Sequence, residues 1–358
     1  MLFRSHYELS EFIPPSNKNT KDVMMSFSNK TCPLDPIPTH IVKDNINLLL
    51  PLISKIVRKP VETGVFPTSL KTSLVRPKLK KPNLEPDLFA NYRPIANIPF
   101  VSKIIEKSVA IQIQNHLNYH GLFPSLQSAY RKHHSTESAL LRGSNEIFRI
   151  LDSQGEVILV LLDLSAAFDT IDHHLLLTRL RTYFNFTGTV LHWFSSYLLD
   201  RFQQVTISDS TSSPRCLEYG VPQGSILGPL LFTLYLAPLQ DVILTRDLHC
   251  MFYADDTQIY ITIRDPGHSA KSVNILQACV NDVFAWYTQN MLKSNPDKTE
   301  ILHFTSRFKK QLSLLETVTL ANSEIRIKGK ATNLGIVMDK NLSLTIISMK
   351  HTKKPFLL

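Results

Sequence analysis

The chain has 358 residues, of which 43% are hydrophobic and 19% charged, a composition that excludes an intrinsically disordered protein. Its formal net charge of +9 suits a polyanionic partner, although many basic proteins bind none. At about 100–200 residues per domain, this length predicts about two subdomains.

The compartment is indicated by the cysteines and by the apolar stretches. Four cysteines lie far apart and form no Cys-x-x-Cys pair, so we expect neither a zinc site nor a disulfide framework. Residues 1–8 carry acidic and polar groups too early for a secretory signal peptide. The longest apolar stretch, 226–239, is too short for a membrane span and is interrupted by two prolines. We therefore expect an intracellular protein, in the cytoplasm, the nucleus or both, that is neither secreted nor membrane-bound.

The first third of the chain predicts an appended region followed by a basic segment. Residues 1–60 form the appended region, with a helical pattern over 41–57. Residues 71–82 hold five basic side chains and no acid around a β-type segment at 73–75, which is typical of a solvated loop or of a hairpin that covers a polyanion. Residues 104–117 repeat apolar side chains at helical spacing and predict an amphipathic helix.

The middle of the chain predicts a buried strand that ends in an acid. Residues 157–162 are an unbroken apolar run, the pattern of a strand buried on both faces, and Asp163 follows directly. A carboxylate there needs a cation, a raised pKa, or a structural role as a turn cap. Beyond it we expect an amphipathic helix over 189–199 and a half-buried strand over 202–208 whose Val205 and Ile207 face the core. A further helix is expected over 230–239.

Paired carboxylates mark the most informative stretch. Asp255 and Asp256 lie between an apolar strand at 250–252 and a second strand at 257–261. Acids at the tip of such a hairpin can hold divalent metal ions for phosphoryl transfer, which needs hard oxygen ligands. An isolated Asp-Asp pair is also typical of a solvated turn.

Three segments, in this order and at these separations, resemble palm motifs A, B and C of reverse transcriptases, specifically those of non-LTR (LINE-type) retrotransposons. The segments are 162–174, 220–229 and the hairpin Tyr253-Ala254-Asp255-Asp256. Upstream, residues 91–95 resemble the fingers motif of the family, and residues 127–131 with 134–137 resemble the block that follows it. Downstream, residues 295–300 resemble motif D, and residues 333–336 with Asp339 resemble the primer-grip region. The resemblance runs from about residue 60 to 344.

The resemblance implies an α+β fold with right-hand polymerase fingers and palm. An antiparallel palm sheet backed by helices would carry the acids, and the thumb would be largely missing. The expected division is an N-terminal extension over 1–60, a reverse transcriptase domain over 61–339, and a truncated tail over 340–358. The chain would then be truncated at both ends relative to full-length elements.

The same resemblance assigns the catalytic residues. Asp163, Asp255 and Asp256 are implied as the catalytic carboxylates and ligands of two Mg²⁺ ions, for which Mn²⁺ could substitute. Asp169 and Asp172 are expected to be capping or structural residues instead.

Five residues are implied to bind the incoming nucleotide. Arg93 would hold triphosphate oxygens, or form a structural ion pair. Phe168 would be the steric gate against a ribose 2′-hydroxyl, or a core side chain. Gln223 and Gly224 would approach the sugar and template base, or serve as turn residues, and Lys298 would protonate or neutralise the departing pyrophosphate.

The implied function is RNA-directed DNA polymerase, with an RNA template, a DNA primer and deoxynucleoside triphosphates as partners. A catalytically idle nucleic-acid-binding relic of a retrotransposon is the alternative. A metal-dependent nuclease is disfavoured, because it would leave the motif B and steric-gate matches unexplained. The oligomeric state stays open.

Overall fold

The computed structural model of the chain describes residues 5–295, 298–306, 316–320 and 323–342. The chain forms two compact units, each built from two separate stretches of sequence. The first unit comprises residues 1–123 and 168–235, and the second comprises residues 124–167 and 236–358. Helices and sheets are mixed, as predicted. The fingers, palm and thumb assignments and the predicted domain boundaries stay predictions.

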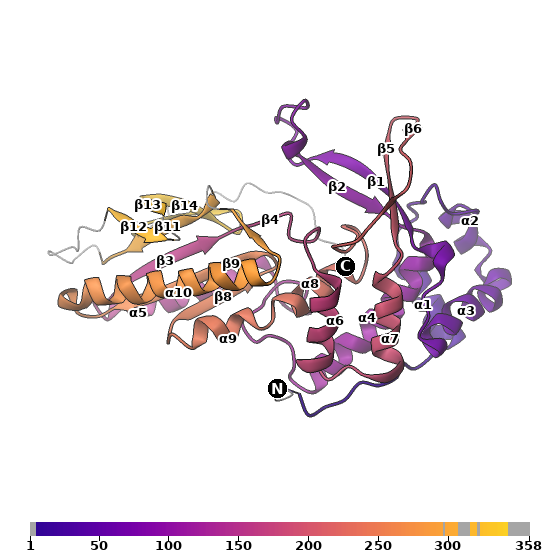
Figure 1. The fold of residues 1–358 in the computed structure, drawn as a ribbon, viewed down its shortest axis with the longest axis horizontal. Helices are drawn as coiled ribbons and strands as arrows, with labels where there is room; N and C mark the ends of the chain where they lie inside the picture. Colours follow the sequence, from indigo (N-terminus) through magenta and orange to yellow (C-terminus); the bar gives the residue numbers. More distant parts are fainter. Residues whose placement is uncertain (1–4, 296–297, 307–315, 321–322, 343–358) are drawn as a thin grey trace. The chain divides into compact units, whose positions relative to one another are not determined.

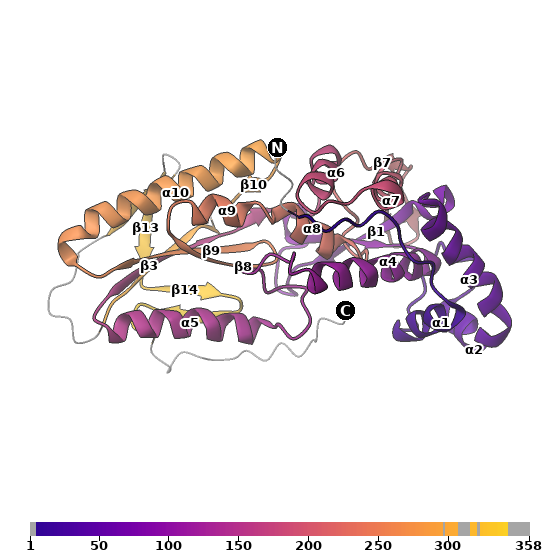
Figure 2. The ribbon, with the colours of Figure 1, turned by 90° about the horizontal axis from the view of Figure 1, so that it is seen from below.

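The first unit combines helices with a small sheet (Figure 1). Strand β1 pairs antiparallel with β2 and parallel with β5, which also pairs with β6 and β7. Helices α1, α3 and α4 pack on one another (Figures 1 and 2). The elements are α1 (Asn17–Ser26), α2 (Thr39–Asp44), α3 (Ile46–Thr63), β1 (Thr72–Leu79), β2 (Tyr92–Asn97), α4 (Phe100–Tyr119), α6 (His173–Thr182), α7 (Gly188–Leu198), β5 (Phe202–Ile207), β6 (Ser210–Thr211), β7 (Arg215–Cys216) and α8 (Gly228–Leu236).

The second unit is organised around a sheet with the strand order β12-β13-β11-β3-β9-β8, and helices α5 and α10 pack against this sheet (Figures 1 and 2). Short pairs β4–β10 and β14–β15 complete it. The elements are α5 (Thr136–Asp152), β3 (Glu156–Leu162), β4 (Leu164–Ser165), α9 (Leu239–Leu244), β8 (His249–Tyr253), β9 (Asp256–Ile263), α10 (Ser269–Gln289), β10 (Lys293–Ser294), β11 (Glu300–Phe304), β12 (Thr317–Leu320), β13 (Ser323–Lys328), β14 (Lys330–Asn333) and β15 (Ile336–Asp339).

Strand β3 is buried on both faces, which confirms the prediction from its apolar run. Val157 and Leu159 face a core cluster to which α5, β9, β11 and the β14–β15 hairpin contribute, and Ile158 and Val160 on the opposite face are buried as well. Burying both faces of the central strand makes it the rigid support of the sheet. The residue that follows it, Asp163, is therefore held at a fixed place.

Two of the predicted helices are confirmed, and two local expectations are wrong. Helices α4 and α7 bury the predicted apolar faces. The pattern over 41–57 is not one helix, because the chain breaks at Asn45 between α2 and α3. Strand β5 forms as predicted, but Val205 and Ile207 are 38% and 61% exposed, since this part of the sheet is not covered on that face.

Gly143 in the middle of α5 has a packing reason. A Cβ atom at this position would lie 2.5 Å from the Cε atom of Met251 on β8, far inside van der Waals contact. Glycine in a helix interior costs about 1 kcal/mol relative to alanine, and here it lets the helix approach the sheet closely. Over the described ranges, no helix is both long enough and apolar enough to cross a membrane.

Candidate functional site

The two adjacent acids lie at the tip of the β8–β9 hairpin, as predicted. Tyr253 pairs with Asp256, so Ala254 and Asp255 form a two-residue turn. Strand β9 also pairs antiparallel with β3, in a register that joins Leu162 to Thr257. One further step along this register places Asp163 across from Asp256. Neighbouring strands therefore bring all three predicted catalytic carboxylates to the same end of the sheet.

The electrostatics of this end reflect burial, together with crowded negative charge. Burial, reinforced by Asp255 and then Asp163, raises the pKa of Asp256 to about 7. Burial, followed by Asp255, Tyr253 and Asp256, raises the pKa of Tyr130 to about 12. Burial and neighbouring acids disfavour the ionised carboxylates here. A cation that enters the site therefore stabilises them.

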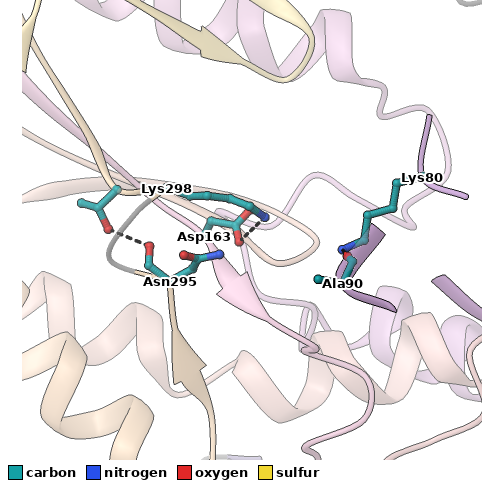
Figure 3. A network of polar contacts seen from close by, with 6 residues as sticks. Lys80, Ala90, Asp163, Asn295 and Lys298 are labelled. Carbon is teal, nitrogen blue, oxygen red and sulfur yellow. Dashed lines mark hydrogen bonds and ion pairs between the residues drawn. The ribbon is translucent and has the colours of Figure 1, made fainter. Parts of the chain in front are cut away.

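Lys298 supplies one such cation. Its Nζ atom lies 3.1 Å from Oδ1 and 3.3 Å from Oδ2 of Asp163 (Figure 3). The approach is set by backbone pairing: β4 pairs with β10 just after Asp163, and the N–H of Asn295 donates to the Asp163 carbonyl oxygen at 3.0 Å. Lys298 is thus joined to the predicted acids. Residues 296 and 297 of the motif D match lie outside the described residues.

A pocket of about 400 Å³ opens at this end of the sheet. It is lined by Asp163, Asp256 and Lys298, and by Gln258, Asn333 and Gly335 among others. The side chains of Gln258 and Asn333 exchange two hydrogen bonds, of 2.9 and 3.0 Å, which tie the β14–β15 hairpin to β9. Within the described part of the chain, no three His, Cys, Asp or Glu side chains are grouped closely enough to hold a metal ion.

The remaining four predicted site residues lie in the first unit. Gln223 and Gly224 dock on β2, where the N–H of Ala96 donates to the Gln223 carbonyl oxygen at 2.7 Å. Gly224 has φ +133°, and a Cβ atom there would lie 2.3 Å from the Ala96 carbonyl oxygen. Only glycine permits both this backbone conformation and this approach.

Phe168 contacts the segment just before this loop, whereas Arg93 lies on the strand that the loop docks on. Phe168 is half-buried, its ring centroid is 5.1 Å from that of Phe232, and its carbonyl oxygen accepts from the N–H of Val221. Arg93 is exposed on β2 and lies directly opposite Lys78 on β1. Asp172 caps helix α6, because its Oδ1 accepts from the N–H of Leu175 at 2.7 Å, which confirms its predicted structural role.

Sequence reasoning missed two buried groups that hold the motif B loop. Glu106 on α4 is fully buried, and its Oε2 accepts from the N–H groups of Ile226 and Leu227 at 2.7 and 3.3 Å. His173 donates from Nε2 to the Gly220 carbonyl oxygen at 2.7 Å. Glu106 could have been found from helical spacing, since it lies four residues before Ala110 and three before Val109, on the buried face of α4.

Comparisons with known proteins identify the family of the chain. Residues 79–338 match the sequence profile of the family described as reverse transcriptase (RNA-dependent DNA polymerase). A probable RNA-directed DNA polymerase from transposon BS of Drosophila melanogaster is 29% identical over 292 residues, which cover 78% of this chain and 30% of that protein. The RNA-directed DNA polymerase from mobile element jockey of Drosophila funebris is 24% identical over 350 residues, which cover 95% of this chain and 37% of that protein.

The chain thus spans about a third of the length of these relatives. The resemblance to reverse transcriptases of non-LTR retrotransposons, first drawn from short motifs, is confirmed along most of the sequence. The motif segments from residue 91 to residue 336 lie within the matched range, as do the acid-bearing strands β3, β8 and β9, while Asp339 lies just beyond it. The chain belongs to the reverse transcriptase (RNA-dependent DNA polymerase) family.

Proposed function

We propose that this chain is an RNA-directed DNA polymerase that adds deoxynucleotides to a primer 3′-hydroxyl on an RNA template. The observation that carries the proposal is the meeting of Asp163 with Asp255 and Asp256 at one end of the second unit's sheet, in a member of this family. In this proposal that sheet is the palm, and the β1–β2 hairpin belongs to the fingers.

The donor set fits a divalent metal ion by its chemistry, while the three side chains are spaced more widely in this structure than metal ligation requires. Asp163, Asp255 and Asp256 offer hard oxygen ligands, and the pKa of Asp256, raised mainly by burial and further by Asp255 and Asp163, marks a carboxylate whose charge a cation would stabilise. These three residues would hold Mg²⁺, with Mn²⁺ as a substitute. When bound, two such ions polarise the attacking hydroxyl and offset charge on the transferring phosphoryl group.

Lys298 has a role of its own in this proposal. Its ammonium group stands against Asp163, where it offsets part of the carboxylate charge before nucleotide enters. It is 60% exposed, so it can turn from Asp163 toward the departing pyrophosphate. Its charge then stabilises the leaving group.

The first unit would bind the nucleotide. Arg93 and Lys78 lie opposite each other across β1–β2, and two like charges in this position destabilise a hairpin unless an anion lies between or beside them. Triphosphate oxygens are such an anion, and the guanidinium group of Arg93 offers paired donors to them. Phe168 would exclude the ribose 2′-hydroxyl, and the Gln223–Gly224 backbone would lie against the sugar.

Primer extension on an RNA template tests the proposal. We expect the purified chain to extend a DNA primer with Mg²⁺ or Mn²⁺, and the double variant Asp255→Asn, Asp256→Asn to lose at least about 100-fold, since metal ligation accounts for several kcal/mol of barrier lowering. A matched control, Asp152→Asn with Asp265→Asn, removes the same charge at two exposed positions of the same unit. Extension by the Asp255, Asp256 variant at the control's rate would refute the assignment.

A further inference from the structure

The turn that carries the acids has a backbone conformation that alanine disfavours. Ala254 has φ +55°, whereas Asp255, the second residue of the turn, does not have a positive φ. A positive φ at the first of two central residues is the pattern of a type II′ hairpin turn, in which glycine is the preferred residue at that position. Alanine there needs support from its surroundings, because its Cβ atom crowds the backbone.

That support comes from one side chain. The Oε1 atom of Gln127 accepts from the N–H of Ala254 at 3.0 Å, and its Nε2 atom donates to the carbonyl oxygen of the same residue at 3.3 Å. The amide group thus bonds both backbone polar groups of Ala254. Oε1 also accepts from the N–H of Ala129 at 2.9 Å, which fixes the orientation of the amide.

The surroundings make this contact rigid. Gln127 is 3% exposed and Ala254 is 8% exposed, so water does not compete for these bonds. Backbone bonds on either side, from Ser128 N–H to the Phe252 carbonyl oxygen and from Phe252 N–H to the Leu126 carbonyl oxygen, run the segment alongside β8. The block at 127–131, to which sequence analysis gave no role, is therefore built against the hairpin that bears the acids.

We propose that Gln127 is a positioning residue for the acid turn: by holding both backbone groups of Ala254, it keeps the turn in the conformation that presents Asp255 and Asp256. The expected effect on catalysis rests on the function proposed above. The expected effect on the conformation of the turn does not depend on that function. Gln127 touches no reacting atom, and its effect passes entirely through Ala254.

The test uses Gln127→Met in the full chain. Methionine matches the length of glutamine but offers no hydrogen bonds of comparable strength. The control is Gln240→Met, because Gln240 on α9 accepts from the N–H of Leu126 at 3.2 Å, so it holds the same segment without touching the turn. If Gln127 only fixed this segment in place, Gln127→Met and Gln240→Met would have the same effect on the turn and on activity.

The first readout is amide hydrogen exchange of peptides that cover residues 252–257, which requires no activity. We expect faster exchange at the turn in Gln127→Met and unchanged exchange there in Gln240→Met. Equal protection of the turn in Gln127→Met and in the unmodified chain would overturn the inference, whether or not the chain extends a primer.

The second readout is primer extension with a rescue. Loss of a positioning group typically lowers activity about 10- to 100-fold, and we expect such a drop in kcat for Gln127→Met with little change in the KM for nucleotide. Adding Ala254→Gly should recover much of it, because glycine adopts the positive φ without support. A double variant no faster than Gln127→Met would contradict the proposal. No extension by the unmodified chain would refute the proposed function and leave the exchange test standing.

Discussion

His173 and His174 are adjacent in sequence, yet only His173 is buried. Burial lowers the pKa of His173 in the folded chain, and Arg201 acts in the same direction, while the bond to Gly220 and the charge of Asp172 oppose them. In the unfolded chain the group regains its ordinary value of 6.5. Below that pH the unfolded chain takes up a proton that the folded chain resists, so stability falls as pH decreases.

We therefore expect His173→Gln to flatten the pH dependence of the free energy of unfolding as the pH falls below about 7, where the unfolded chain begins to protonate this group. Glutamine keeps a side-chain donor for the Gly220 carbonyl oxygen but does not titrate. Urea unfolding at several pH values measures the slope. His174→Gln serves as the control, since that side chain is exposed, and it should retain the slope of the unmodified chain. Equal slopes in both variants would argue against His173 as the titrating group.

At the same scale, the sequence pattern placed the acids, and it did not predict which side chains contact them. Asp163, Asp255 and Asp256 could be predicted because each follows or interrupts a strong strand pattern. The contact of Lys298 with Asp163 depends on pairing between β4 and β10, which are more than 100 residues apart in sequence. The amide of Gln127 likewise acts across a long separation. Local periodicity carries no information on such contacts.

The β1–β2 hairpin concentrates positive charge on one element. Across the described residues, neither Lys78 nor Arg93 is paired with a carboxylate, and the two lie opposite each other. Lys80 is differently placed, because its Nζ atom donates to the Ala90 carbonyl oxygen at 2.7 Å (Figure 3). Lys78 and Arg93 are therefore available to phosphate, as is the exposed Arg76 on β1.

Replacing Lys78 and Arg93 with Gln should flatten the salt dependence of nucleic-acid binding. Each lost phosphate contact should reduce the log–log slope by about 0.7 for a single strand or 0.9 for a duplex. Fluorescence anisotropy at several salt concentrations measures it. The control, Lys55→Gln with Lys59→Gln, removes the same charge from the exposed side of α3. If the control lowers the slope equally, net charge and not the hairpin accounts for binding.

Helices and strands could be predicted from the sequence where they pack against a hydrophobic core, and their burial was predicted less well elsewhere. The apolar spacing of α4 and α7 and the unbroken run of β3 correspond to buried faces. Strand β5 alternates just as clearly, but Val205 and Ile207 stay exposed. Alternation of apolar and polar residues indicates that the two faces of a strand differ. It does not indicate whether another element packs on the apolar face.

The chain as a whole passes between its two units three times, at residues 123–124, 167–168 and 235–236. The unit formed by 1–123 and 168–235 therefore depends on contacts between remote parts of the sequence. Phe66 packs edge-on against Trp193 and Tyr197, and its N–H donates to the Ser196 Oγ atom at 2.9 Å. Strand β5 is the parallel partner of β1.

A fragment of residues 1–123 should consequently fail to fold alone, because Phe66 and the β5 side of β1 lose their partners. Mixing it with a fragment of residues 168–235 should restore a cooperative thermal transition, followed by circular dichroism. The same mixture with Trp193→Ala should melt far lower or not assemble, since emptying a fully buried tryptophan site costs about 3–5 kcal/mol. A cooperative transition in residues 1–123 alone, at the temperature of the mixture, would mean that the second stretch is dispensable and that the fold of this unit is encoded before residue 124.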